Sequence, residues 1–328
     1  MSAAAIHGPR EIRSCPLTGV EVVLASARRV ERAPPRPPEP DPSECPFCPG
    51  NEAATPPTIA TRGGGGAWVA RAFPNRAPAL VVEQRPDRHR EGPFERLAGT
   101  GAHEVVVCCP EHRALHELPA ERSIDALLLA RERILDLRRD PRLRVLQWFR
   151  NQGLGGSASQ PHPHAQIVGL PFVPDRIRRL GARASEHRLR TGASLLQRVV
   201  EAESREGRRV VAEQGDLVAL CPFAPAFPFE VWIAPRRPAG HWVDEGEEGV
   251  ASLATLARDL EARMAAVLGD VPTRQALVGT AEGGEGGWWL RLAPHLASAG
   301  GLELATDTTV HGVFPEEAAT ALRGVQRP

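Results

Sequence analysis

The sequence predicts an α+β protein in which a unit of roughly 150 residues is duplicated and the two units form one continuous, mainly antiparallel sheet flanked by helices. Three observations lead to this expectation. The chain has 328 residues, enough for two such units. Short apolar runs alternate with stretches of helical periodicity. Two segments also have similar sequences. In each, a glutamate (Glu104 or Glu230) begins an apolar run that ends at a proline and is followed by a histidine. We therefore expect an N-terminal half over 1–172 and a C-terminal half over 173–328.

Each element is predicted from its pattern of apolar and turn residues. Short apolar runs bounded by turn residues indicate strands, and they cover 20–24, 68–72, 104–109, 143–149, 161–169, 209–213, 217–222, 229–235, 288–292 and 302–306. Apolar residues at three- and four-residue spacing, or a proline in a first turn, indicate helices, and they cover 117–140, 175–206 with a break near Gly192, 246–268 and 315–325. The proline-rich segment 27–42 favours an extended chain, with a flexible linker as the alternative. A polar loop is expected over 81–100.

The charge balance and the cysteines limit the class of protein. The 40 basic residues, all arginine, are matched by 40 acidic residues, and zero net charge disfavours nucleic-acid binding because phosphate contacts need a basic face. No run of about 18 apolar residues occurs, so no membrane span is expected, and the first residues lack the apolar segment of a secretion signal. Six cysteines in a chain of this length do not indicate a disulfide framework. We therefore expect a cytoplasmic protein.

The most informative segment is the H-P-H-A-Q motif at 162–166, which follows a loop rich in glycine and serine. On a strand, His162, His164 and Gln166 point to one face, and polar groups in an otherwise apolar strand are costly unless they have a function. Pro163 lacks an N–H, so the strand is expected at a sheet edge or at a bulge. The preceding loop offers backbone N–H groups to a phosphate. The alternative, a buried structural histidine, has to account for all of these features together.

A second motif is the C-P-F-C sequence of Cys45 and Cys48. The spacing fits either a zinc site or a redox pair. A redox pair is expected to open a helix after a strand, whereas this pair lies in a proline-bracketed loop. Zinc takes four ligands, usually cysteine and histidine, and His112 and His162 are candidates for the other two. Because the four residues are far apart in the chain, their spacing alone does not establish the site.

Taken in order, these segments resemble the galactose-1-phosphate uridylyltransferases, a family of the histidine-triad superfamily of nucleotidylyl transferases. The matching segments are PLTG at 16–19, SARRVER at 26–32, CPFC at 45–48, FPNRAPAL at 73–80, GAHEVVV at 101–107, N-x-G…S-x-x-H-P-H-x-Q from Asn151 to Gln166, and PEEAATALR at 315–323. The resemblance implies two histidine-triad-like halves. The N-terminal half would carry a zinc site and the catalytic motif, and the C-terminal half a degenerate motif and a sugar-recognition segment.

The activity implied by the resemblance is transfer of UMP from UDP-glucose to galactose 1-phosphate or a related sugar 1-phosphate. His164 would attack the α-phosphorus and form a uridylyl-histidine intermediate, which divides one difficult displacement into two easier ones. Gln166 and Ser159 would donate hydrogen bonds to the phosphate oxygens as charge shifts in the transition state. The substrate-binding positions implied in the same way are Arg29, Arg32, Asn75, Asn151, Ser157 and Glu303.

The resemblance also implies a metal and a partner. One zinc ion per chain would be held by Cys45, Cys48, His112 and His162, and would shape the strand rather than take part in the reaction. A homodimer is expected, because members of this family commonly share their sites between subunits.

Some positions depart from the family pattern. A second metal site of many members would use a glutamate where this chain has Leu180 and an H-x-H pair where it has 289–291, so no second metal is expected. Arg76 stands where aspartate is common, Ser157 where glycine is expected, and the sugar-recognition segment around Glu303 is altered. Two alternatives therefore stay open. One is an ADP-sugar or dinucleotide phosphorylase with the same covalent step, and the other is an inactive zinc-bound protein that binds nucleotide sugars.

Overall fold

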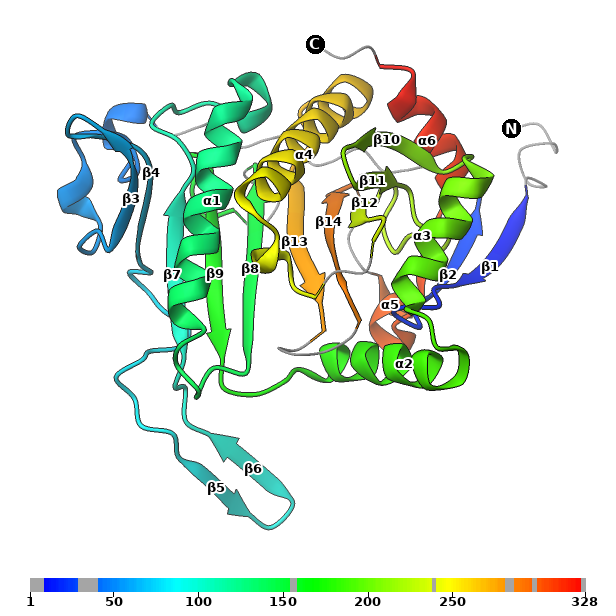
Figure 1. The fold of residues 1–328 in the computed structure, drawn as a ribbon, viewed down its shortest axis with the longest axis horizontal. Coiled ribbons are helices and arrows are strands. Elements are labelled where there is room, and N and C mark those ends of the chain that lie inside the picture. The colour runs from blue at the N-terminus through cyan, green and yellow to red at the C-terminus, as the bar shows by residue number, and fades with distance from the viewer. Residues whose placement is uncertain are drawn as a thin grey trace.

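The structure is a computed structural model, and it describes residues 9–28, 41–153, 158–237, 240–280, 286–296 and 300–325. Its centre is a ten-stranded sheet in which every neighbouring pair is antiparallel (Figure 1). In spatial order the strands are β10 (Val210–Gln214), β11 (Leu217–Leu220), β12 (Val231–Pro235), β14 (Trp288–Pro294), β13 (Thr273–Gly279), β8 (Val145–Gln152), β9 (His164–Leu170), β7 (Ala102–Val107), β4 (Ala67–Pro74) and β3 (Ala60–Gly64).

The sheet consists of two halves with the same topology. Each half contributes five strands. Counted from the outer edge of the sheet towards its centre, the first three strands follow the order of the chain and the last two are exchanged, which gives β3-β4-β7-β9-β8 in one half and β10-β11-β12-β14-β13 in the other. Each half has one long helix between its third and fourth strands, α1 (Ala120–Leu137) and α4 (Glu247–Leu268). The halves join where β8 pairs with β13. The expected duplicated α+β unit with a continuous antiparallel sheet is confirmed.

The two faces of the sheet are covered differently. On one face, α1, α4 and α6 (Pro315–Arg323) enclose the largest apolar core. On the other face, the C-terminal half packs against α2 (Asp175–Thr191), α3 (Leu195–Glu206) and a small sheet. That sheet contains β1 (Arg10–Ser14), β2 (Glu21–Ala25) and β15 (Thr309–His311). The N-terminal half has a smaller core there, in which Cys45 and Phe47 cover Phe73, Val105 and Val107. Fewer buried apolar side chains therefore cover this face of β7 and β9.

Several sequence predictions are wrong. The segment 302–306 is not a strand but part of helix α5 (Gly301–Thr306), because Glu303 accepts a hydrogen bond from the Gly300 N–H at 2.9 Å and caps the first turn. The expected loop over 81–100 contains a hairpin of β5 (Arg88–Glu91) and β6 (Phe94–Leu97), which projects away from the sheet (Figure 1). The polar strand β1, the strands β3 and β13 and the short strand β15 were not predicted, and β3 covers part of the segment 63–66 that was expected to be a turn. The proline-rich segment falls almost wholly on 29–40, outside the described residues.

The edge position expected for the strand of the H-P-H-A-Q motif is also wrong. β9 lies inside the sheet, between β7 and β8. The strand tolerates Pro163 because it begins one residue later, at His164, and the Pro163 carbonyl still accepts a hydrogen bond from the Cys108 N–H at 2.9 Å. His162 therefore lies outside the strand. Within the described residues, no helix combines the length and the apolar character needed to cross a membrane.

Candidate active site and metal centre

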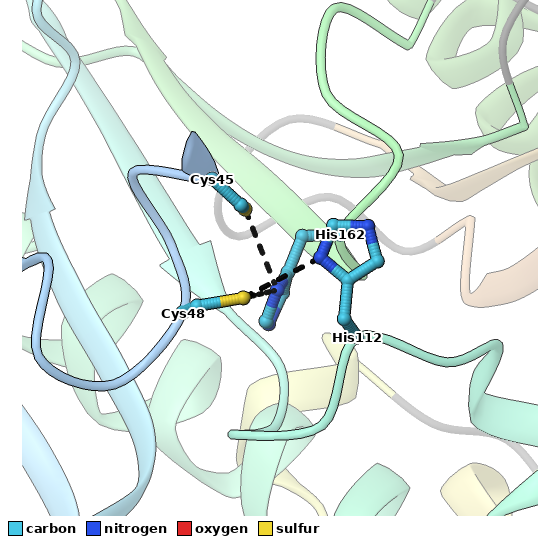
Figure 2. Close-up of side chains that lie close together, drawn as sticks. All are labelled: Cys45, Cys48, His112 and His162. Carbon is cyan, nitrogen blue, oxygen red and sulfur yellow. Dashed lines mark hydrogen bonds between the residues drawn. The ribbon is translucent and has the colours of Figure 1, made fainter. Parts of the chain in front are cut away.

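Four side chains from three distant segments meet at the lightly covered face of the N-terminal half (Figure 2). Cys45 and Cys48 come from a tight turn in which the Cys48 N–H donates to the Cys45 carbonyl at 3.3 Å. His112 follows β7, and His162 precedes β9. Since β7 and β9 are paired, the ends of these strands carry the two histidines to the same place.

The geometry of this cluster fits a tetrahedral metal ion. The Cys48 Sγ lies 3.4 Å from His112 Nδ1 and 3.5 Å from His162 Nδ1, and the Cys45 Sγ lies 3.7 Å from His162 Nδ1. Around a tetrahedral zinc ion, sulfur and nitrogen ligands are separated by about 3.6 Å. The second nitrogen of His162 donates to the Cys109 carbonyl at 2.8 Å, so its Nδ1 lone pair faces the cysteines, as metal-binding histidines require.

Protonation in the cluster is expected to change when a cation binds. Burial and the neighbouring Cys45 raise the pKa of Cys48 to about 11, and burial lowers the pKa of His162 to about 4. Without a cation, the Cys48 thiol therefore keeps its proton, while the His162 imidazole stays neutral. A divalent ion accepts thiolates and neutral imidazoles and replaces those protons. The four residues expected to bind a metal are thus brought together with suitable chemistry.

His164, the expected nucleophile, is the first residue of β9 and is only 4% exposed. Its Nδ1 lies 2.9 Å from the carbonyl oxygen of His162, which can only accept a hydrogen bond, so the proton is on Nδ1 and the lone pair on Nε2. Burial lowers the pKa of His164 and keeps the ring neutral. The ring of Phe47 packs against it, with 5.2 Å between centroids. A neutral imidazole held in one orientation is suited to nucleophilic attack.

Gln166 lies two residues further along β9, on the same face as His164. Its Oε1 is 2.7 Å from Nε2 of His103, a residue of β7. Asn75 completes this group, since its N–H donates to the His103 carbonyl at 2.8 Å and its Nδ2 lies 3.1 Å from His103 Nε2. Sequence reasoning did not assign a role to His103, although the residue lies in the G-A-H-E segment that matched the family.

The remaining expected site residues are less closely gathered. Asn151 lies on β8, and the β8–β9 register, continued past the Phe149–Gln166 pair, brings it level with His164. Ser159 is exposed in the loop that leads to β9. Glu303 is on α5, which lies by the C-terminal half of the sheet and away from β7 and β9 (Figure 1), so the chain does not bring it to His164. Three others, Arg29, Arg32 and Ser157, lie outside the described residues.

The positions considered for a second metal have other roles here. Leu180 is buried in the core between α2, α3 and the sheet. Arg291 forms an ion pair with Glu230, with 2.7 Å between Nε and Oε1. Glu230 also accepts a hydrogen bond from the Trp232 indole at 2.6 Å. Glu104, the counterpart of Glu230 in the sequence, instead forms an ion pair with Arg133 of α1. The side chains of the two glutamates therefore lie on opposite faces of the sheet.

Comparisons with known proteins agree with this arrangement. Residues 8–174 match the model of the galactose-1-phosphate uridyl transferase N-terminal domain. An ADP-glucose phosphorylase from Arabidopsis thaliana is 28% identical over 330 residues, covering 96% of this chain and 93% of that protein. A galactose-1-phosphate uridylyltransferase from Thermotoga maritima is 32% identical over 231 residues, covering 69% of this chain and 67% of that protein.

Solved structures show the same fold. An Arabidopsis thaliana ADP-glucose phosphorylase with bound ADP-glucose superposes with a TM-score of 0.83 at 26% identity, covering 97% of this chain and 99% of that chain. A uridylyltransferase superposes with a TM-score of 0.74 at 27% identity, covering 95% and 97%. Since the family model spans half of the sequence and includes all four residues of the metal cluster and the H-P-H-A-Q motif, this chain belongs to the galactose-1-phosphate uridyl transferase family.

Proposed function

We propose that the protein is a nucleotidylyl transferase that takes the nucleotidyl group of a nucleoside diphosphate hexose onto His164 and passes it to a second phosphate group. The observation that carries this proposal is the hydrogen bond from His164 Nδ1 to the His162 carbonyl at 2.9 Å. This bond leaves the Nε2 lone pair of a neutral, buried imidazole for attack. Gln166, on the same face of β9, has an amide suited to a phosphate oxygen.

The reaction then proceeds in two displacements. In the first, His164 Nε2 forms a bond to the α-phosphorus while the bond to the hexose 1-phosphate oxygen breaks, and hexose 1-phosphate leaves with the electron pair. In the second, an oxygen of the acceptor phosphate forms a bond to the same phosphorus, and the N–P bond breaks to restore the imidazole. We assign the nucleotide and phosphate contacts to Gln166, Ser159, Asn75, Asn151, Ser157, Arg29 and Arg32.

Two pairs of donor and acceptor are compatible with this chemistry. We place ADP-glucose with inorganic phosphate first, because the Arabidopsis phosphorylase is similar over nearly the whole chain in both sequence and fold. The altered sugar segment and Arg76 in place of aspartate agree with a substrate other than the usual one. UDP-glucose with galactose 1-phosphate is the second candidate, favoured by the family model and by the Thermotoga relative.

We further propose that the metal is one zinc ion per chain, held by Cys45, Cys48, His112 and His162. When bound, zinc supplies a structural crosslink between the C-P-F-C turn and the ends of β7 and β9. The cluster adjoins the nucleophile, since His162 supplies the carbonyl that orients His164. We place the reaction in the cytoplasm, where reducing conditions keep the cysteines available as ligands.

The proposed assembly is a homodimer in which each site is completed by the partner. Within one chain, helix α5, which carries Glu303, lies by the C-terminal half of the sheet and away from β9 (Figure 1), so we propose that Glu303 serves as a sugar contact in the site of a second copy. We divide the chain at 172/173, between β9 and α2. The N-terminal half then carries the reacting residues, and the C-terminal half carries the sugar-recognition segment.

A half-reaction tests the function. The protein is incubated with ADP-glucose alone and, separately, with UDP-glucose alone, and hexose 1-phosphate release and the mass of the peptide containing His164 are measured. An increase by AMP or by UMP on that peptide is expected, and its identity decides the donor. If neither sugar nucleotide yields product or a labelled peptide while the metal is present, the proposed function is wrong.

A further inference from the structure

We propose that His103 is a positioning residue for the transfer, which holds the side-chain amide of Gln166 with its N–H groups turned toward the phosphate. The inference rests on the proposed function and adds a residue to it. The two side chains come from neighbouring strands, where Val105 of β7 is paired with Gln166 of β9. His103 is two residues before Val105, on the same face of β7, so it reaches Gln166 diagonally, with 2.7 Å between His103 Nε2 and Gln166 Oε1.

The protonation state of His103 follows from a backbone donor. The Ala79 N–H donates to His103 Nδ1 at 3.1 Å, and a backbone N–H cannot act as an acceptor. Nδ1 therefore carries a lone pair, and the proton of the neutral imidazole is on Nε2. The Nε2–H group then donates to the group facing it on Gln166. That group has to be the amide oxygen, which determines the orientation of the whole amide.

Asn75 does not compete with Gln166 as an acceptor of this proton, and its approach to His103 Nε2 is a contact between two donors rather than a hydrogen bond. Its Oδ1 accepts a hydrogen bond from the Ala77 N–H at 2.9 Å, so the Nδ2 group that lies 3.1 Å from His103 Nε2 is a donor. Nε2 cannot accept from Asn75, because His103 would then have no proton on either nitrogen. The single proton on Nε2 is thus directed to Gln166.

The consequence is a donor in a defined position beside the nucleophile. With Oε1 bound to His103, the Nε2 hydrogens of Gln166 point away from β7, and His164 lies two residues earlier on the same face of β9. Residues two apart on a strand are separated by about 7 Å, a distance that a phosphoryl group in contact with both side chains can span. Without His103, the amide can rotate and present its oxygen to the negatively charged phosphate.

The test is a double-mutant cycle on the rate at which the nucleotidyl-enzyme forms. The substrate is whichever of ADP-glucose and UDP-glucose labels the wild type, and the variants are His103→Leu, Gln166→Ala and the double variant. We expect His103→Leu to slow the labelling about 10- to 100-fold. In the Gln166→Ala background, the same change should slow it less than about 3-fold, because the group that His103 orients is already absent.

A purely structural role would behave differently. His103→Leu would then slow labelling by the same factor with and without Gln166, and that result overturns the proposal. A second variant guards against misfolding, since the amide nitrogen of His103→Gln reaches the position of Nε2 and should restore most of the rate lost in His103→Leu. Failure of this rescue in a folded, metal-containing variant also overturns the proposal. Absence of labelling in the wild type would instead refute the proposed function, so the two failures are distinguishable.

Discussion

The carbonyl oxygen of His162 accepts the Nδ1 proton of His164 at 2.9 Å. The same residue faces Cys45 and Cys48 with its ring nitrogen. His162 therefore belongs to the candidate metal cluster through its side chain and orients His164, the proposed nucleophile, through its backbone. This arrangement would link the proposed metal centre to the proposed reaction, because a shift of His162 would move the proton acceptor that keeps the lone pair of His164 on Nε2.

The change His164→Gln should abolish the reaction while leaving the metal in place. Glutamine is polar and of similar size, but its amide cannot form the covalent intermediate. We expect the transfer rate to fall about 10⁴-fold or more and the metal content to stay at the wild-type value. Mass spectrometry of the labelled peptide and elemental analysis check both points. A nucleotidyl adduct that persists in the variant would show that another residue is the nucleophile.

The change Cys48→Ser should remove the metal. Hydroxyl oxygen is a poor replacement for a thiolate, and a structural metal contributes directly to folding free energy. We expect about one metal ion per wild-type chain and much less than one in the variant, with a lower unfolding temperature. A chelator should destabilise the wild type but have little effect on Cys48→Ser. The matched control Cys221→Ala, at a buried cysteine of the core, should keep its metal. A variant with full metal content would refute the assignment.

A buried ion pair behind the site should be sensitive to removal of one partner. Arg150 of β8 pairs with Glu261 of α4, and both side chains are 4% exposed. Gln275 also donates to the same carboxylate at 2.6 Å. The change Arg150→Met leaves the carboxylate without its cation, and we expect a loss of about 3–5 kcal/mol in unfolding free energy. The double change Arg150→Met/Glu261→Met should cost much less. Urea unfolding measures both variants, and equal losses would contradict this account.

Stability should fall in mild acid, in part through His311. Burial lowers the pKa of His311, whose Nε2–H donates to the Pro225 carbonyl at 2.9 Å and whose Nδ1 accepts from the Val313 N–H at 3.4 Å. Because the pKa is lower in the folded chain, the unfolded chain binds the proton first as the pH falls below about 6.5. The contribution of His311 is therefore complete above that pH and is lost progressively below it.

The matched variant is His311→Gln, which removes the titrating group. Its unfolding free energy should decline less between pH 8 and pH 5 than that of the wild type, while the other buried histidines titrate in both proteins. Urea unfolding across this range provides the comparison. Parallel pH profiles would mean that His311 does not contribute.

Mixed dimers test the shared site. We expect His164→Gln and Glu303→Gln to be inactive or strongly impaired as separate proteins. In a homodimer whose sites combine His164 of one copy with Glu303 of the other, a mixed dimer retains one intact site. Random mixing of equal amounts should restore about one quarter of the wild-type activity. A mixture that stays as inactive as its components would place Glu303 outside the partner's site.

Much of the fold and of the site can be predicted from local sequence patterns. The spacing of His164 and Gln166 places both side chains on one face of a strand whatever the strand packs against. The two cysteines of C-P-F-C can approach one ion because the turn between them is short. Apolar runs and helical periodicity likewise predict most strands and the long helices, since burying a strand face or a helix stripe requires those patterns.

Other features follow only from which segments become neighbours in space. Cys48 and His112 are 64 positions apart in the chain, and the β7–β9 pairing brings them together. The pairing of His103 with Gln166 depends on strand register, which no local pattern reveals. Glu303 caps a helix because its carboxylate accepts a hydrogen bond from the Gly300 N–H, although the apolar residues around it in the sequence favour a strand. The sequence by itself determined which chemical groups are present and which of them share one face of a strand. The tertiary structure decided which residues these groups contact, because contacts between distant segments depend on the packing of the whole sheet.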